Sequence, residues 1–186
     1  MHPNVQEILF DEATVQKRVG ELAQQIAEDY RHSDKKLVLL CILKGSVVFM
    51  GDLMKKIPIP VEIDFMRVSS YGQGSKSSGT IRIQLDLIRG DIADCDILIV
   101  EDIVDSGRTC SYLTNYLLLK GAHSVRTVTL LDKPARREVD FKADYTGFEI
   151  PDAFIVGYGL DYQERYRDLP YIGILKPSVY AEKGES

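Results

Sequence analysis

The chain has 186 residues, of which 45% are hydrophobic and 27% charged, and its formal net charge is -5. A chain of this length and composition is expected to fold as one globular domain over residues 1–186. The acidic balance argues against a nucleic-acid partner, because it provides no overall basic field. No apolar run approaches the roughly 20 residues that cross a bilayer. Residues 1–14 also lack the pattern of a secretory signal, so we expect a cytoplasmic protein with no membrane partner.

The first half of the chain alternates helical and strand patterns. Apolar residues at helical spacing between Asp11 and Tyr30 predict a helix, with Asp11 as its N-cap. The apolar run 37–43 predicts a strand that is covered on both faces. Residues 44–46 break this run, and 47–57 predict a second helix that Pro58 closes.

A loop rich in glycine and serine interrupts two further strands. The strands are predicted at residues 61–68 and 80–87, so the loop 69–79 would lie at the tip of a long hairpin. A loop of this length inside a compact domain is usually functional or disordered.

The second half continues the same alternation. Strands are predicted at 96–100, 125–131, 153–156 and 171–175, and a helix at 109–120 that ends at Gly121. This order predicts an α/β fold with a mainly parallel sheet flanked by helices, whose ligands bind at the carboxyl ends of the strands. Cys41, Cys95 and Cys110 lack CxxC spacing and are expected to be buried free thiols.

The segment LIVEDIVDSGRT, residues 98–109, contains the strongest functional pattern. A strand at 97–101 followed by a helix from about 108 places the turn 105–109 at a helix N-terminus. Backbone N–H groups, the hydroxyls of Ser106 and Thr109, and the close approach that Gly107 allows would together bind a phosphate. The turn matches neither G-x-G-x-x-G nor G-x-x-x-x-G-K-[ST].

Three acids beside this turn indicate that the ligand is a sugar phosphate. Glu101 and Asp102 would accept hydrogen bonds from ribose hydroxyls, and Asp105 would lie near the reacting carbon or an attached base. An acid at such a turn is often only an N-cap, which Asp105 or Ser106 could be. The combination of apolar run, Glu-Asp and Asp-Ser-Gly-x-Thr favours the functional interpretation.

This segment resembles the phosphoribosyl-pyrophosphate motif of the type I phosphoribosyltransferases. The rest of the chain is similar to their hypoxanthine (hypoxanthine-guanine) branch, and Pro134 after Lys133 is one departure. The matching segments are Leu43-Lys44-Gly45, Ser70-Tyr71, Lys133, Phe148 to Asp152, Gly157 to Tyr162, and Arg167 to Pro170. The resemblance implies a core at about 35–145, a hood from about 1–10 and 146–186, and a lid at 69–79.

The resemblance also implies a reaction, in which a 6-oxopurine and phosphoribosyl pyrophosphate give a nucleoside monophosphate and pyrophosphate. Mg²⁺ would be the cofactor, with Glu101, Asp102 and Asp161 as its candidate ligands. Asp105 would be the general acid/base. Residues implied to bind phosphoribosyl pyrophosphate are Glu101, Asp102, Ser106, Gly107, Arg108, Thr109, Lys44, Gly45 and Arg167.

The implied purine site rests on Lys133, which would donate to the 6-oxo group, and on Phe154, which would stack on the base. The backbone around Ile155 would contact the ring edge, with Asp161 nearby. Ser70 and Tyr71 would work in the lid that excludes water.

Two alternatives stay open. One is a phosphoribosyltransferase that prefers xanthine; a pyrimidine substrate fits Phe154 and Lys133 less well. The other is a non-catalytic regulator that senses phosphoribosyl pyrophosphate, against which the acidic charge argues. The sequence also leaves open the choice between hypoxanthine and guanine, while a homodimer or homotetramer is expected from the resemblance.

Overall fold

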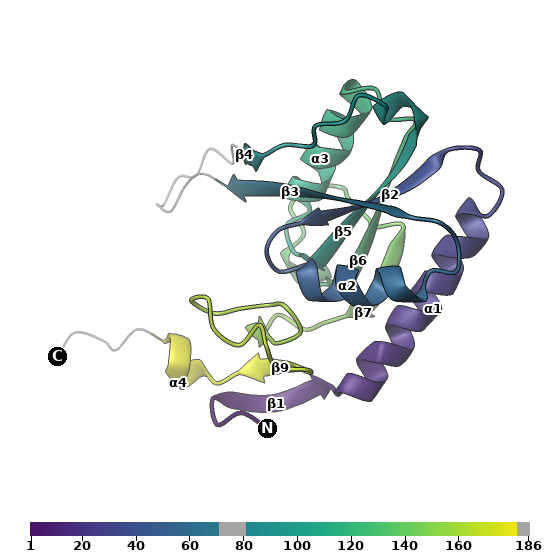
Figure 1. Cartoon of the computed structure of the whole chain (residues 1–186). Coiled ribbons are helices and arrows are strands. Elements are labelled where there is room, and N and C mark those ends of the chain that lie inside the picture. Colours follow the sequence, from purple (N-terminus) through teal and green to yellow (C-terminus); the bar gives the residue numbers. More distant parts are fainter. Residues whose placement is uncertain (71–80, 182–186) are drawn as a thin grey trace.

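Two β-sheets organise the computed structural model, which describes residues 1–70 and 81–181 (Figure 1). The larger sheet has the strand order β4-β3-β2-β5-β6-β7, and the smaller sheet has the order β1-β9-β8. The strands are β1 (Val5–Phe10), β2 (Lys36–Ile42), β3 (Glu62–Ser70), β4 (Ile81–Leu85), β5 (Cys95–Val104), β6 (Ser124–Asp132), β7 (Tyr145–Glu149), β8 (Ile155–Val156) and β9 (Ile172–Leu175). The helices are α1 (Glu12–Tyr30), α2 (Val47–Lys56), α3 (Arg108–Leu119) and α4 (Pro177–Tyr180), with 3-10 turns η1 (Ile92–Asp94) and η2 (Pro134–Arg136).

The larger sheet is parallel except at one edge. Its central strands β2 and β5 contain continuous apolar, buried runs at 37–42 and 97–100, and they pair in parallel with Val38 opposite Ile97. Only strands that are covered on both faces can be apolar at every position. The edge strand β4 runs antiparallel to β3, so the hairpin predicted around the loop 69–79 is confirmed for its two strands. The predicted mainly parallel α/β sheet is confirmed.

Helices cover both faces of this sheet (Figure 1). Leu39 and Cys41 of β2 pack in the same apolar cluster as residues of α1 and α2. The alternate residues Val38 and Leu40 pack in the cluster that contains Leu113 of α3. Side chains alternate across a strand, so one seven-residue strand supplies both cores. The helices cover the faces of the sheet, so a ligand would bind at the carboxyl ends of the strands.

The helix α1 forms where its apolar spacing predicted it. Asp11 accepts a hydrogen bond from the backbone N–H of Thr14 at 2.8 Å and is the N-cap, as predicted. The buried residues of α1 recur every three or four positions, and they are Val15, Val19, Leu22, Ala23, Ile26, Ala27 and Tyr30. No helix in the described part of the chain is both long enough and apolar enough to cross a membrane.

Three strand predictions differ from the structure. Strand β5 continues past its predicted end to Val104, which still pairs with Asp132 of β6. Glu101 and Asp102 therefore lie inside the strand. Strands β1 and β7 were not predicted. Both are edge strands with several partly exposed residues, so neither has the continuous apolar run that identified β2 and β5.

The smaller sheet brings distant parts of the described chain together below the larger one (Figure 1). Val5 of β1 pairs with Leu175 of β9, and Ile155 of β8 pairs with Ile174. The segment 157–169 leaves β8 and returns to β9. It extends from this sheet toward the carboxyl ends of the parallel strands.

Candidate active site

The turn between β5 and α3 lies at the N-terminus of a helix, as predicted. Gly107 is the N-cap of α3 and has φ +80°, in the left-handed region that favours glycine. A Cβ atom there would lie 3.0 Å from Phe141 Cβ and 3.1 Å from Arg137 Cδ. The Ser106 hydroxyl accepts a hydrogen bond from the backbone N–H of Arg108 at 3.3 Å. The backbone N–H groups at the N-terminus of α3 would therefore face a ligand that binds over this turn.

A cavity of about 230 Å³ lies over the turn and joins it to two of the acids. Its floor comes from the ends of β2 and β5 and its side from the first turn of α3. The residues that line it are Ile42, Val68, Glu101, Ile103, Val104, Asp105, Ser106, Gly107, Thr109 and Cys110. The structure therefore brings together five of the predicted site residues in one cavity.

Glu101 is buried at the floor of this cavity, with only 6% of its surface exposed. Its Oε2 atom lies 3.4 Å from Ser46 Oγ, which donates to it, and its Oε1 atom lies 4.0 Å from Cys110 Sγ. Burial, and after it the adjacent Asp102 carboxylate, raise the pKa of Glu101 well above its ordinary value. A buried carboxylate with so few donors favours a ligand that brings hydroxyl groups or a cation.

Asp102 points to the opposite face of β5, because successive side chains of a strand alternate. It lies against the loop that follows β2: a Cβ atom on Gly45 would be 1.6 Å from Asp102 Oδ2. The Asp102 Oδ1 atom accepts a hydrogen bond from its neighbour Ile103 N–H at 2.8 Å. Burial raises the pKa of Asp102 to about 6. Only glycine at position 45 leaves room for this carboxylate.

Two predicted pyrophosphate-binding cations converge beside the same loop. Lys44 Nζ lies 3.0 Å from Glu164 Oε2, and Arg167 Nη2 lies 3.4 Å from Glu164 Oε1. Arg167 Nη2 also lies 2.8 Å from Asp161 Oδ1. The carboxylate of Glu164 thus already bridges Lys44 and Arg167, which shows that this space accepts an anion.

The segment 157–169 and the Lys44 loop touch through their backbones. A Cβ atom on Gly159 would lie 2.1 Å from the carbonyl oxygen of Gly45, and Gly159 has φ +100°. The Arg167 Nη1 atom donates to the Gly159 carbonyl at 2.8 Å. Lys44 and Arg167 are therefore neighbours because of two glycines, in segments more than a hundred residues apart in sequence.

Asp105 and Lys133 lie on the other side of the turn. Asp105 Oδ1 is buried and has no hydrogen-bond partner in residues 1–70 and 81–181. Lys133 is 6% exposed, and its Nζ atom donates to the carbonyl of Ala153 at 2.9 Å. Burial lowers the pKa of Lys133, and the nearby Asp105 carboxylate opposes that shift. A buried carboxylate oxygen that lacks a donor is suited to accept a proton or hydrogen bond from a ligand.

The aromatic ring predicted to stack on a base is accessible. Phe154 is 37% exposed, and its ring centroid lies 5.2 Å from that of Tyr162 and 5.1 Å from that of Tyr180. The next residue, Ile155, is buried in β8. Lys133 bonds to the carbonyl of Ala153, the residue directly before Phe154, so the lysine lies beside the backbone that carries this ring.

The cavity lining does not include the predicted residues Lys44, Gly45, Asp102, Lys133, Phe154, Ile155, Asp161 and Arg167, which lie around it, or Arg108 and Ser70. The side chain of Arg108 is exposed and forms an ion pair with Glu138, 2.5 Å away. Ser70 is the last residue of β3, and Tyr71 lies outside the described residues. The predicted lid 69–79 is therefore described only at its first two positions.

Other residues of the site were not predicted. Ser46 is fully buried and links the carbonyl of Ile42 to Glu101, and its signal was its place directly after Lys44-Gly45. Cys110 was predicted only to be a buried thiol, which is confirmed, and it also lines the cavity. Glu164 carried no local signal, because its role depends on Lys44, which is 120 residues away.

The carboxylates fit a magnesium ion that is shared with a phosphorylated ligand. Mg²⁺ prefers oxygen ligands, keeps several waters, and is usually held by one or two carboxylates together with substrate phosphates. Asp102 and Asp161 lie around the Lys44 loop and Arg167, where such phosphates would bind. Among the described residues, no cluster of three or more His, Cys, Asp or Glu side chains could hold a metal ion by itself.

Comparisons with known proteins agree on one family. The family model described as phosphoribosyl transferase domain matches residues 5–163. The hypoxanthine-guanine phosphoribosyltransferase of Bacillus subtilis is 50% identical over 180 residues, which cover 97% of this chain and 98% of that protein. A bifunctional protein TilS/HprT of Listeria innocua is 50% identical over 182 residues, and this chain spans 28% of its length.

Solved structures of the same kind superpose over nearly the whole chain. A hypoxanthine phosphoribosyltransferase from Staphylococcus aureus has a TM-score of 0.91 at 49% identity, with 97% of each chain covered. The enzyme of that name from Trypanosoma cruzi also has a TM-score of 0.91, at 43% identity, with 98% of this chain and 97% of that chain covered.

Proposed function

The chain belongs to the phosphoribosyl transferase family, and from this premise we propose that it transfers the 5-phosphoribosyl group of phosphoribosyl pyrophosphate to a 6-oxopurine. Hypoxanthine, and also guanine, would be converted to the nucleoside monophosphate, with release of pyrophosphate, in purine salvage. The observation that carries the proposal is the cavity in which Glu101 and Asp105 meet the turn 106–109.

The phosphoribosyl group would lie along the carboxyl end of β5. The turn Ser106 to Thr109 would bind the 5′-phosphate through its backbone N–H groups and hydroxyls. Glu101 and Asp102 would accept hydrogen bonds from the ribose hydroxyls, one from each face of the strand. Arg108 would contribute its backbone, since its side chain bonds to Glu138.

Lys44, the Gly45 backbone and Arg167 would bind the pyrophosphate, and the two cations already pair with an anion, the carboxylate of Glu164. We propose Mg²⁺ as the cofactor, with Asp102, Asp161 and Glu101 as ligands, directly or through water. Bound there, the ion would offset the negative charge that develops on the leaving pyrophosphate.

Asp105 would act as the general acid/base on the purine ring nitrogen as the glycosidic bond forms. Its buried Oδ1 atom, which has no hydrogen-bond partner among the described residues, leaves a position for that ring N–H. Lys133 would donate to the 6-oxo group, Phe154 would stack on the ring, and the backbone at Ile155 would contact its edge. Adenine would present a donor to the Lys133 ammonium, a mismatch that gives large discrimination.

Ser70 and Tyr71 would belong to a lid that keeps water from the reacting carbon. We also propose a cytoplasmic protein that forms a homodimer or homotetramer. In α2, Phe49 and Met50 are buried in the core, whereas Val47 and Met54 are 44% and 37% exposed. Sedimentation velocity would test this assembly, and a monomer at micromolar concentration would contradict it.

The test of the proposed function is a spectrophotometric assay with phosphoribosyl pyrophosphate and Mg²⁺, run in parallel with hypoxanthine, guanine, xanthine and adenine. Turnover of hypoxanthine or guanine that a chelator abolishes is expected, with little turnover of adenine. Fastest turnover with xanthine would favour a xanthine-preferring enzyme. Binding of phosphoribosyl pyrophosphate without turnover of any base would favour a sensor and contradict the proposal.

A further inference from the structure

The segment 157–169 has an unusual backbone for one that carries two candidate site residues, Asp161 and Arg167. Tyr158 has φ +49°, and three further non-glycine residues of the segment, Gln163, Glu164 and Tyr166, also have φ between +52° and +77°. Residues other than glycine rarely adopt this conformation, which persists only where the surrounding structure holds it. Some contact outside the segment must therefore hold its shape.

The side chain of Tyr158 provides such a contact. Tyr158 is only 3% exposed, and its hydroxyl donates to Asp52 Oδ2 at 2.6 Å. Asp52 belongs to α2, which begins directly after the Lys44-Gly45-Ser46 turn. The hydroxyl of Tyr158 therefore ties the segment to the same helix that carries the Lys44 loop at its N-terminus.

Asp52 is itself held by three donors from different parts of the chain. Besides Tyr158, Gln16 Nε2 of α1 donates to its Oδ2 atom at 2.6 Å, and Lys55 Nζ of α2 lies 2.7 Å from its Oδ1 atom. A carboxylate with several donors and a cation has one preferred position. Asp52 is therefore a fixed acceptor for Tyr158.

Backbone hydrogen bonds at Tyr158 and Gly159 connect this anchor to the candidate site. Its N–H donates to the carbonyl of Leu169 at 2.8 Å, and the N–H of Gly159 donates to the carbonyl of Arg167 at 3.0 Å. Gly159 then lies against the carbonyl of Gly45, where a Cβ atom would approach to 2.1 Å. The residue that carries the buried hydroxyl anchor is therefore followed directly by the residue at which the segment meets the Lys44 loop.

We propose that Tyr158 and Asp52 are a positioning pair, whose hydrogen bond holds Arg167 and Asp161 in register with Lys44 for binding of the pyrophosphate group. This inference rests on the proposed function and adds residues to its site. Neither side chain touches the cavity over the turn 105–109. The pair acts through the backbone of Gly159, so its loss affects the pyrophosphate end and leaves the purine end unchanged.

The first test replaces Tyr158 with phenylalanine, which keeps the ring and removes the hydroxyl. In Tyr158→Phe, the KM for phosphoribosyl pyrophosphate and the Kd for magnesium pyrophosphate are expected to rise about tenfold, since small misplacements of binding groups have large effects. The KM for hypoxanthine and the kcat at saturation are expected to change less than about twofold, because the purine contacts are untouched.

Tyr145→Phe is the matched control. Tyr145 is 6% exposed, and its hydroxyl donates to Asp29 Oδ2 at 2.6 Å, the same length as the Tyr158 bond. It lies in β7, where it pairs with Val128 of β6, outside the segment 157–169. Both variants are expected to lower the Tm by similar amounts, and only Tyr158→Phe is expected to weaken pyrophosphate binding.

A double-mutant cycle tests the partner. Asp52→Asn is expected to raise the same KM, and Tyr158→Phe/Asp52→Asn is expected to behave like the more affected single variant, because both changes break one bond. Multiplicative effects would show that the two residues act separately and would overturn the pairing. If Asp52→Asn does not fold, the comparison of Tyr158→Phe with Tyr145→Phe still decides.

Calorimetric titration of magnesium pyrophosphate keeps this test independent of catalysis. Absence of turnover in the unsubstituted protein would contradict the proposed function, and the Kd for pyrophosphate could still be compared between the variants. Equal pyrophosphate affinity in Tyr158→Phe and the unsubstituted protein, with the Tm lowered as in Tyr145→Phe, would overturn the positioning role and leave only a structural one.

Discussion

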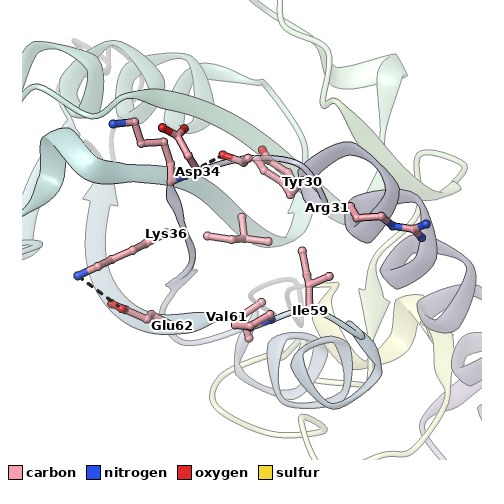
Figure 2. Close-up of a pocket in the computed structure, with 11 residues that line it drawn as sticks. Tyr30, Arg31, Asp34, Lys36, Ile59, Val61 and Glu62 are labelled. Carbon is pink, nitrogen blue, oxygen red and sulfur yellow. Dashed lines mark hydrogen bonds and ion pairs between the residues drawn. The ribbon is translucent and has the colours of Figure 1, made fainter.

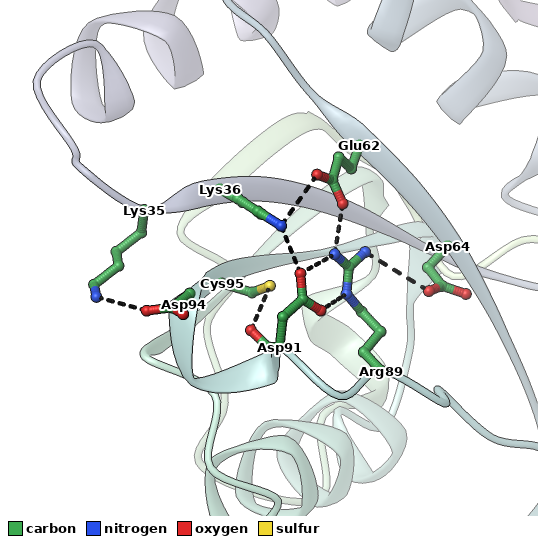
Figure 3. A network of polar contacts seen from close by, with 8 residues as sticks. All are labelled: Lys35, Lys36, Glu62, Asp64, Arg89, Asp91, Asp94 and Cys95. Carbon is green, nitrogen blue, oxygen red and sulfur yellow. Dashed lines mark hydrogen bonds and ion pairs between the residues drawn. The ribbon is translucent and has the colours of Figure 1, made fainter.

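At the amino ends of β2, β3 and β5, acidic side chains form ion pairs with cations, whereas Glu101 and Asp102, near the carboxyl end of β5, form no ion pair with any cation in the described part of the chain. Arg89, 12% of whose side chain is exposed, lies 2.5 Å from Glu62 and 3.0 Å from Asp91, and Lys36 lies 2.7 Å from Asp91 (Figure 3). The hydrogen bonds from Arg89 and then Lys36 hold the pKa of Asp91 well below its ordinary value. In contrast, burial raises the pKa values of Glu101 and Asp102.

The carboxyl pKa values at the two ends of the sheet shift in opposite directions. The pairing of acids with cations, and not the volume of a cavity, therefore distinguishes the functional end of this sheet. A hollow of about 350 Å³ at the amino end is larger than the 230 Å³ cavity at the carboxyl end. Apolar residues such as Ile59 and Val61 line part of it, and Glu62, one of its two acids, contacts Lys36 (Figure 2). Perturbed, unpaired acids mark sites where a ligand completes the charge balance.

The largest effect is expected from Asp105→Asn at the carboxyl end. Loss of the general acid/base should lower kcat by about 10²–10⁴-fold. The Tm should fall by no more than a few degrees, because Asp105 Oδ1 has no partner among the described residues to lose. Steady-state kinetics and a thermal melt check both quantities. Full activity in a folded Asp105→Asn protein would contradict the assigned role.

The raised pKa of Asp102 predicts how stability depends on pH. A carboxyl whose folded-state pKa lies above its unfolded value stabilises the fold most at low pH and loses that contribution as pH rises. For Asp102, with a model-peptide value of 3.8 and a folded value of about 6, the loss occurs between about pH 4 and pH 6.

The contribution is on the order of 2 kcal/mol in the free energy of unfolding, after allowance for partial solvent screening. Urea denaturation at several pH values should show that Asp102→Asn gains stability relative to the unsubstituted protein across this interval. The same relative stability at pH 4 and pH 7 would contradict the raised pKa. Magnesium and phosphoribosyl pyrophosphate should reduce the difference by binding the ionised form.

At the amino ends of the strands, a substitution is expected to change stability and not catalysis. Arg89→Met should lower the free energy of unfolding by about 1–3 kcal/mol, because it removes the nearer cation of Glu62 and one of the two cations that contact Asp91. The values of kcat and KM should be unchanged at a temperature where the variant is folded. A large loss of kcat in Arg89→Met would break the division between the two ends.

The smallest effect is expected from Glu164→Gln. Its carboxylate competes with pyrophosphate for Lys44 and Arg167, but it is 65% exposed, so its removal should tighten pyrophosphate binding only about two- to fivefold. Glu138→Gln, which removes a similarly exposed acid that pairs with Arg108, is the matched control. Weaker binding in Glu164→Gln would contradict competition.

Local patterns predicted the parts of the molecule that are formed locally. The helix that Asp11 caps follows from side-chain spacing and capping chemistry, and the strand, turn and helix over 97–109 follow from an apolar run that ends in a glycine turn. Both are present, although the strand continues to Val104. The edge strand β1 could not be predicted in the same way. Its residue Val5 pairs with Leu175, 170 residues away, and the other five residues of the strand are exposed or partly exposed.

The site shows the same division. The acids and the phosphate-binding turn are contiguous in sequence, so their types and order indicated a sugar phosphate. The roles of Tyr158 and Glu164 arise from contacts with residues 106 and 120 positions away, and from left-handed backbone at both. Short-range periodicity carries no information on such contacts.

The most direct test of this account measures hypoxanthine turnover with phosphoribosyl pyrophosphate and Mg²⁺ in three proteins side by side: the unsubstituted chain, Asp105→Asn and Arg89→Met. The account predicts rapid turnover by the unsubstituted chain and by Arg89→Met, and a loss of at least about 10²-fold in kcat for Asp105→Asn. Turnover by Asp105→Asn equal to that of the unsubstituted chain, or loss of turnover in folded Arg89→Met, would contradict it.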